Sequence, residues 1–134
     1  ISTVTNKGQM RWRIFDGAPT TTILTDFLRR LITGQTKKLF LILDNLRVHH
    51  AKPVKAWLAE HADAIEVFYL PSYSPELNPD EMANADIKQA VTKLAPARTK
   101  LQLAKATAKH LRSVQRQPER IRKYFEHATV RYAA

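Results

Sequence analysis

Residues 39–44 of the chain read Leu-Phe-Leu-Ile-Leu-Asp, an unbroken apolar run that ends in a carboxylate. Five consecutive apolar residues are typical of a central parallel strand buried on both faces, whereas an edge strand usually alternates with polar residues. Functional groups in open α/β sheets gather outside the carboxyl ends of the strands. The run therefore predicts an α/β fold, with Asp44 as a candidate site residue at the functional edge of its sheet.

The elements on either side of this run follow from turn residues and apolar spacing. Pro53 suits the first turn of a helix and residues 65–70 read as a second strand, so we expect a right-handed parallel crossover. Residues 1–5 and 10–15 are β-prone runs around an Asn-Lys-Gly turn, which predicts an antiparallel hairpin. Further helices are predicted from Thr20 to Gly34, from Asn78-Pro79 to about Leu94, from Thr99 to Gln115, and after Pro118. The predicted inward residues are Ala83, Ile87, Ala90, Val91 and Leu94 in the second of these helices, and Ile121, Tyr124 and Phe125 in the last.

Length and composition limit the class of protein and its chemistry. A chain of 134 residues with 44% hydrophobic content fits one domain, and we expect residues 1–134 to form one. Because the sequence has no cysteine, disulfides and thiolate-bound zinc are excluded, and Asp, Glu and His are the possible metal ligands. No run of about 18 apolar residues and no secretory leader is present, so we expect a cytoplasmic protein without a membrane partner.

The positive charge of the chain is concentrated near its C-terminus. Residues 1–85 carry 10 Lys and Arg against 9 Asp and Glu, whereas residues 86–134 carry 12 against 3. The basic helices expected within 98–134 therefore suit a polyanion, of which nucleic acid is the commonest. A solvated basic surface is the alternative.

The helix predicted from Thr99 to Gln115 begins a run of four basic residues on one side, which we call the basic stripe. At 100° per residue these four side chains fall within an arc of about 60°, opposite Leu103, Leu111 and Val114. Contact with the DNA backbone and an ordinary solvated helix face both explain such a pattern. The basic stripe consists of Lys105, Lys109, Arg112 and Arg116.

A second carboxylate, Glu81, falls in the first turn of the helix that follows the proline-rich loop. If that helix packs on the sheet, Glu81 and Asp44 come together, one from a helix start and one from a strand end. Each acid alone also has a structural explanation. A glutamate in a first helical turn interacts favourably with the helix dipole, and an aspartate after a strand can cap a loop.

The residues around both acids form a more specific pattern. Residues 41–45 read Leu-Ile-Leu-Asp-Asn, and residues 70–81 read Leu-Pro-Ser-Tyr-Ser-Pro-Glu-Leu-Asn-Pro-Asp-Glu. In this order, with 36 residues between Asp44 and Glu81, they resemble the catalytic core of the mariner-like superfamily of DDE transposases, particularly its bacterial insertion-sequence branch. The resemblance runs nearly end to end and includes Asn84-Ala85-Asp86-Ile87-Lys88, Tyr124-Phe125 and Val130-Arg131-Tyr132.

The resemblance implies a ribonuclease-H-like fold, a mixed central sheet flanked by helices. Asp44 is then the second acid and Glu81 the third acid of the DDE triad. The first Asp is expected on a strand upstream of Ile1, so that residues 1–134 are an N-terminally truncated catalytic domain without its first strand. Asp16 follows the expected hairpin, and we interpret it as a surface turn residue.

Cleavage and joining of DNA strands need an activated water or 3′-hydroxyl and a stabilised leaving oxygen. Two Mg²⁺ ions about 3.5–4 Å apart supply both, and hard oxygen ligands are what Mg²⁺ and its substitute Mn²⁺ accept. Asp44 and Glu81 are therefore the predicted metal ligands as well as the predicted catalytic residues.

Other residues near the acids are candidates for support or for DNA contact. Asn45 either orients the Asp44 carboxylate or forms a turn. Arg47 and His49 occupy the loop after the strand, where phosphate contact and loop packing are the two interpretations. Asn84 and Lys88 follow Glu81 by one and two helical turns, and Lys88 is either a DNA contact or a solvated lysine.

The leading hypothesis is a transposase that acts on double-stranded DNA at transposon ends and target sites, associates with the bacterial nucleoid, and is inactive as this fragment alone. Two other hypotheses remain. In one, the chain is a transposase relic or a domesticated DNA-binding or interaction module. In the other, a neighbouring reading frame supplies the missing segment. A homo-oligomer is compatible with each.

Overall fold

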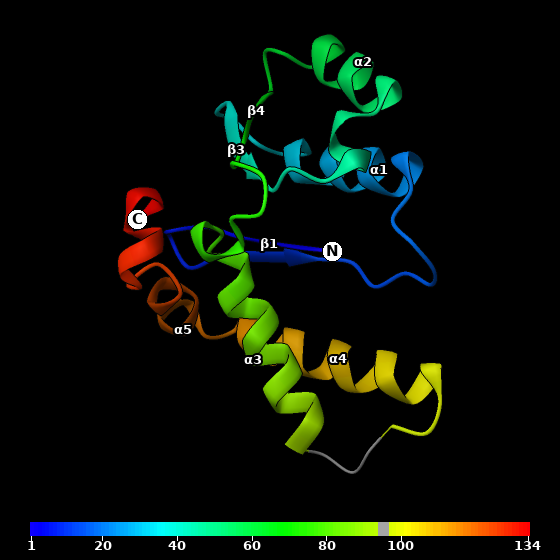
Figure 1. Cartoon of the computed structure of the whole chain (residues 1–134), viewed down its shortest axis with the longest axis vertical. Helices are drawn as coiled ribbons and strands as arrows, with labels where there is room; N and C mark the ends of the chain where they lie inside the picture. Colours follow the sequence, from blue (N-terminus) through cyan, green and yellow to red (C-terminus); the bar gives the residue numbers. More distant parts are fainter. Residues whose placement is uncertain (94–96) are drawn as a thin grey trace. The chain divides into compact units, whose positions relative to one another are not determined.

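The computed structural model describes residues 1–93 and 97–134 and has a mixed α/β composition of small sheets and several helices (Figure 1). Residues Asp16–Asn78 form one compact unit, and Ile1–Phe15 together with Pro79–Ala134 form another. Each unit has its own hydrophobic core. That residues 1–134 act as one domain stays a prediction.

The Asp16–Asn78 unit begins with helix α1 (Thr21–Ile32). The hydroxyl of Thr20 caps this helix by accepting a hydrogen bond from the Ile23 N–H at 3.2 Å, and Gly34 follows its end with a φ of 76°. Both boundaries confirm the prediction. The buried stripe of α1 consists of Leu24, Phe27, Leu28 and Leu31.

Strands β3 (Leu39–Leu43) and β4 (Ile65–Tyr69) pair in parallel, as predicted. Only one face of this pair is buried. Leu41 and Ile65 point into the core, whereas Phe40 is 63% exposed, so the expectation of burial on both faces is wrong. Both helices of the unit pack on the same face, and apolar side chains stay exposed on the other.

Helix α2 (Lys52–Glu60) connects the two strands, preceded by the 3₁₀ turn η1 (Arg47–His50). Pro53 stands in its first turn, where the missing N–H costs nothing, as predicted. Val54 and Trp57 are buried against α1 and the strands. After β4 the chain forms a second 3₁₀ turn, η2 (Pro75–Leu77).

The other unit opens with the predicted antiparallel hairpin, β1 (Ser2–Val4) and β2 (Met10–Trp12). Gly8 in its turn has a φ of 85°, and a Cβ added there would lie 2.6 Å from the main-chain oxygen of Pro118. No other residue type satisfies both conditions without a shift of the chain. The turn composition that predicted the hairpin therefore also permits its packing against the start of α5.

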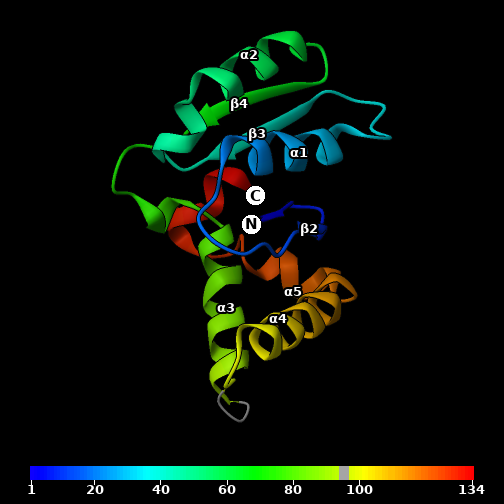
Figure 2. The ribbon, with the colours of Figure 1, turned by 90° about the vertical axis from the view of Figure 1, so that its right-hand side faces the viewer.

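Helices α3 (Asp80–Lys93), α4 (Lys100–Gln115) and α5 (Pro118–Lys123), followed by the 3₁₀ segment η3 (Ala128–Ala133), complete this unit (Figure 2). The inward positions predicted for α5 are confirmed. On α3, Ala83 is buried and Ile87 packs partly against the core, while Leu94 lies outside the described residues. The buried cluster consists of Met10, Ala83, Leu111, Val114, Ile121, Tyr124 and Phe125.

The four strands pair as two separate two-stranded sheets, β1 with β2 and β3 with β4. The single mixed central sheet expected from the sequence is therefore not formed by the described strands. A sheet is continuous only where neighbouring strands share a backbone hydrogen-bond ladder. Among the described strands, no ladder joins the antiparallel hairpin to the parallel pair.

A charged cluster connects the three helices of the second unit. Arg120 of α5 donates two hydrogen bonds to the carboxylate of Asp86 on α3, and the Tyr124 hydroxyl donates a third. His110 of α4 lies 3.5 Å from the same carboxylate. The Asp86 side chain is 15% exposed. Burial alone would raise the pKa of Asp86, but the hydrogen bonds from Arg120 and Tyr124 and the nearby positive charges outweigh it and lower the pKa.

Replacing Asp86 by Ala is expected to lower the free energy of unfolding by about 2–3 kcal/mol at pH 7, because it leaves a partly buried arginine and tyrosine without their acceptor. The folded pKa of Asp86 is lowered, so this contribution is complete above the unfolded carboxyl pKa of about 3.9 and is lost as the pH falls through the folded value. Urea denaturation of both proteins at pH 7 and pH 3 measures the difference.

The matched control is Glu119→Ala, which removes an 80% exposed carboxylate that pairs with Arg122 on the same helix. An exposed pair of this kind contributes about 0–1 kcal/mol. Equal effects of the two substitutions at pH 7 would contradict the assigned role of Asp86.

Candidate functional site

Asp44 directly follows β3, as predicted, and 41% of its side chain is exposed. The parallel register places Leu43 opposite Tyr69, the last residue of β4. The Leu70 N–H then donates to the Leu43 carbonyl at 2.8 Å, which extends the backbone pairing up to Asp44. The carboxylate is thus carried by a paired strand end and is open to solvent.

His49 of η1 is turned inward onto Asp44. Its side chain is 9% exposed, and its Nδ1 lies 2.7 Å from the main-chain oxygen and 3.1 Å from the Oδ1 of Asp44. Both oxygens only accept hydrogen bonds, so Nδ1 is the nitrogen that carries hydrogen. The hydrogen bond of Nδ1 goes to the main-chain oxygen, and Oδ1 is a close polar contact beside it. Among the described residues, no other polar group contacts the Asp44 carboxylate, so Oδ2 is open.

The loop around Asp44 is held by a chain of polar and ring contacts. Asn45 donates from Nδ2 to the Ser72 hydroxyl at 2.8 Å, and its Oδ1 accepts from His50 Nε2. The His50 ring stacks on Tyr69 with 4.2 Å between ring centroids. The Tyr69 hydroxyl, whose pKa is raised by burial, donates to the His49 main-chain oxygen at 2.9 Å. Asn45 therefore links this loop to the proline-rich loop.

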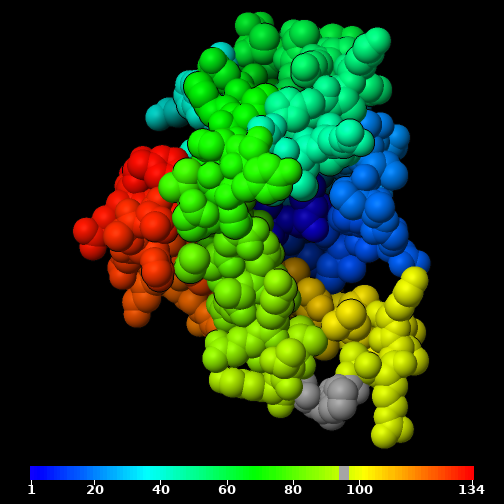
Figure 3. Space-filling model, in the orientation of Figure 1, coloured from blue at the N-terminus to red at the C-terminus, as the bar shows by residue number. Residues whose placement is uncertain are grey.

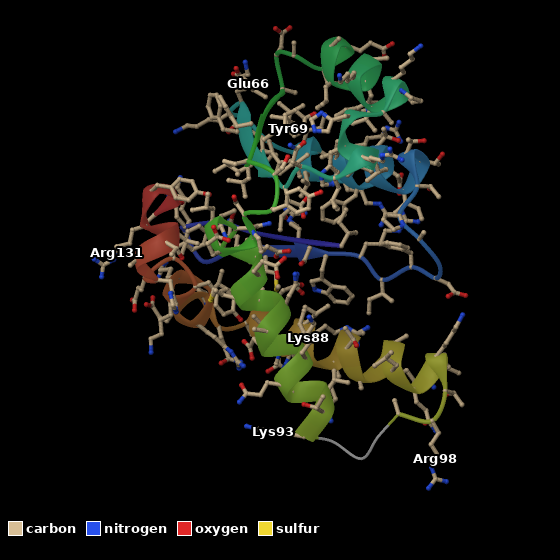
Figure 4. All side chains as sticks on the ribbon, in the orientation of Figure 1. Glu66, Tyr69, Lys88, Lys93, Arg98 and Arg131 are labelled. Atoms are coloured by element: carbon tan, nitrogen blue, oxygen red, sulfur yellow. The ribbon has the colours of Figure 1, made fainter. Side chains whose placement is uncertain are left out.

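Sequence reasoning missed Tyr69 and Ser72, which complete these contacts. Tyr69 lies at the end of β4 (Figure 4), and its spacing from Asp44 carries no pattern in the sequence. The parallel register was the signal that could have found it, because residues at matching carboxyl ends of paired strands become neighbours. Arg47, by contrast, is exposed and available for contact with a phosphate.

Glu81 stands with Asp80 in the first turn of α3, where the helix dipole favours negative charge. Asp80 accepts a hydrogen bond from the Ser2 hydroxyl at 2.9 Å. Glu81 is half-buried, and among residues 1–93 and 97–134 no group donates a hydrogen bond to it. Asn84 is half-buried one turn later, and Lys88 is exposed two turns later (Figure 4).

Asp44 and Glu81 belong to different units, and the meeting of their carboxylates stays a prediction. Within the described part of either unit, no three His, Asp or Glu side chains gather as a possible metal site. Asp16 is exposed in a bend after the hairpin, in keeping with its interpretation as a surface turn residue.

All four members of the basic stripe are exposed, three of them on α4 and Arg116 directly after its end; the surface of α4 is visible in yellow and orange in Figure 3. Leu111 and Val114 are buried on the opposite side, as expected, but Leu103 is 46% exposed. Leu103 stands in the first half of α4, and the buried residues of this helix, Leu111 and Val114, stand in its second half. The Arg112 guanidinium also lies 6.0 Å from the centre of the Trp12 ring.

None of the described helices is long and apolar enough to cross a bilayer. The model of the family described as DDE superfamily endonuclease matches residues 1–104. The matched range includes Asp44, the proline-rich loop and Glu81 and ends within α4. No curated protein matches the chain.

Proposed function

Because the chain belongs to the DDE superfamily of endonucleases, we propose that it is the catalytic domain of a DNA transposase of the mariner-like superfamily, from its bacterial insertion-sequence branch. A transposase-type nuclease function and a DNA substrate follow from the family. The observation that carries the proposal further is the Asp44 carboxylate, fixed at a strand end with one oxygen open to a cation, within a family match that also spans Glu81.

The proposed fold is ribonuclease-H-like. Each of the two small sheets has only two strands, so every described strand keeps one edge without a ladder partner. In the proposal, a strand outside residues 1–134 carries the first Asp and completes the mixed sheet. Unpaired edges of this kind also favour association with a second chain, which is the basis for proposing a homo-oligomer.

The donor set suits a hard divalent cation such as Mg²⁺ or Mn²⁺. Asp44 and Glu81 offer carboxylate oxygens, and among the described residues neither Oδ2 of Asp44 nor the Glu81 carboxylate has a hydrogen-bond partner. Bound metal would supply activation of a water or 3′-hydroxyl and stabilisation of the leaving oxygen. Asp44 holds its position through β3 and the surrounding loop, and Glu81 through the first turn of α3.

Several other residues take supporting roles in the proposal. Lys88 is exposed and reaches a DNA phosphate beside the acids, while Asn84 lies between Lys88 and Glu81 on the same side of α3. Arg47 contacts backbone phosphate from η1, and the basic stripe contacts it from α4. Phosphate contacts of this kind position DNA without reading its sequence, so recognition of transposon ends lies elsewhere.

A non-catalytic role is the second candidate. The described structure contains the two acids of the matched motifs, and Asp16, the aspartate that follows the hairpin in the sequence, is an exposed bend residue. A relic or domesticated module would keep the basic stripe and bind DNA without cutting it. Metal binding and cleavage separate the two functions.

Asp44 and Glu81 are expected to account for Mn²⁺ binding, which calorimetry of the chain would measure. Replacing both by Ala should abolish the heat of binding, because two hard oxygen ligands are lost. Replacing two exposed acids, Glu60 and Asp63, removes the same charge and should leave binding unchanged. Mn²⁺ binding that survives loss of Asp44 and Glu81 would contradict the ligand assignment.

Replacing the four basic-stripe residues by Ala is expected to weaken binding of duplex DNA equally for unrelated sequences. The plot of log affinity against log salt should flatten by up to about 0.9 per lost phosphate contact. Fluorescence anisotropy over a range of salt concentrations measures both effects. A control with the same loss of charge replaces four exposed residues of the other unit: Arg29, Arg30, Lys52 and Lys55. If the control flattens the slope as much as the stripe variant does, the stripe is not the DNA surface.

Residues 1–134 alone are expected to cut DNA poorly, at least about 10²–10³-fold more slowly than the same chain with an upstream strand that carries an Asp. The reason is that a missing metal ligand leaves one reacting oxygen without a preorganised electrostatic contact. Cleavage of a transposon-end duplex with Mn²⁺, with and without that segment, tests this. Robust cutting by residues 1–134 that Glu81→Ala abolishes would show that another residue, such as Asp16, completes the triad.

A further inference from the structure

His49 is the one buried polar residue among the described residues, with 9% of its side chain exposed, and it lies against a candidate metal ligand. Burial of an imidazole costs free energy unless its nitrogens find partners. The hydrogen-bond partner of Nδ1 is the main-chain oxygen of Asp44, at 2.7 Å. The carboxylate oxygen Oδ1 of Asp44 lies 3.1 Å from the same nitrogen. The burial of His49 is thus compensated at Asp44 itself.

We propose that His49 is a positioning residue that fixes the Asp44 carboxylate through Nδ1, holding Oδ1 and leaving Oδ2 for a divalent cation. This inference rests on the proposed function, since it assigns Asp44 as a metal ligand. It replaces direct phosphate contact as the role of His49, because a side chain that is 9% exposed presents little surface to DNA.

The surroundings of His49 fix the imidazole in place. Tyr69 donates to its main-chain oxygen, and its neighbours in the chain, Val48 and Ala51, pack on the α1–α2 core. The Asp44 side chain, by contrast, is 41% exposed, and among the described residues His49 Nδ1, at 3.1 Å from Oδ1, is its one close polar contact. A carboxylate on a single exposed side chain rotates freely about χ1 and χ2, and a fixed N–H dipole on one oxygen restricts that rotation.

His61 provides an internal comparison in the same unit. Its Nδ1 also lies 2.7 Å from a main-chain oxygen, that of Trp57, and its ring stacks on Trp57 with 4.0 Å between centroids. Among the described residues, no carboxylate pairs with His61, so it illustrates a histidine that only packs. What distinguishes His49 from His61 is therefore the Asp44 carboxylate.

Nitrogen-15 NMR tests the contact without any substitution of His49. Nδ1 of His49 should carry hydrogen, and its Hδ1 resonance should move upfield in Asp44→Asn while that of His61 stays unchanged. This readout does not depend on metal, so it decides whether His49 contacts the carboxylate even if Asp44 proves not to be a metal ligand. A hydrogen-free Nδ1, or an Hδ1 resonance that ignores Asp44→Asn, overturns the proposal.

Variants of His49 separate positioning from packing. The amide nitrogen of Asn occupies the place of Nδ1, whereas that of Gln occupies the place of Nε2. His49→Asn should keep Mn²⁺ affinity near that of the wild type, and His49→Gln should lower it about tenfold, a loss typical of residues that orient metal ligands. His61→Gln should leave the affinity unchanged, and thermal midpoints identify any variant that fails to fold.

Two outcomes of the Mn²⁺ titration are distinguishable. If Asp44→Asn abolishes Mn²⁺ binding but a folded His49→Gln binds as tightly as the wild type, the positioning role is overturned and the proposed function stands. If Asp44→Asn itself leaves Mn²⁺ binding intact, the metal-ligand assignment and with it the proposed function fail, and the NMR result alone decides the His49 contact.

Discussion

The parallel pairing of β3 with β4 is the constraint on which the candidate site depends. Its register sets Leu43 opposite Tyr69, so the two strand ends bring their following residues to one edge. From that edge come Asp44 and Asn45 on one side and Tyr69 and Ser72 on the other. The pairing is stabilised by burial of one strand face on α1 and α2, and every polar contact around Asp44 builds on it.

The helices of the other unit, which also carries Glu81, are held together by the partly buried carboxylate of Asp86. Asp86 joins α3 to α4 and α5 through Arg120, Tyr124 and His110. Residues of the segments 84–88 and 124–125, which strengthened the family resemblance in the sequence, thus have a structural explanation in this unit. A residue pattern shared with an enzyme family marks residues that hold the fold as well as residues that react.

The basic stripe and the candidate acids suit different parts of DNA cleavage, namely binding the DNA backbone and carrying out the reaction. The exposed members of the basic stripe suit a polyanion held by many weak contacts, whereas Asp44 is a single carboxylate held by a few short ones. This division is expected for a nuclease. Affinity for DNA comes largely from phosphate contacts spread over a surface, and catalysis depends on a small number of preorganised groups.

The sequence by itself determined the secondary structure, the parallel strand order and the position of Asp44 at a strand end, because turn residues, caps and apolar spacing are local signals. It could not determine that β3 is buried on one face only, since Phe40 and Leu41 are equally apolar and only the placement of α1 and α2 distinguishes them. Nor could it determine that His49 turns inward onto Asp44 while Arg47 faces solvent. The inward position of His49 depends on the 3₁₀ turn η1 and on Tyr69. Tyr69 stands 20 positions further along the chain, and only the folded backbone brings its hydroxyl to the His49 carbonyl.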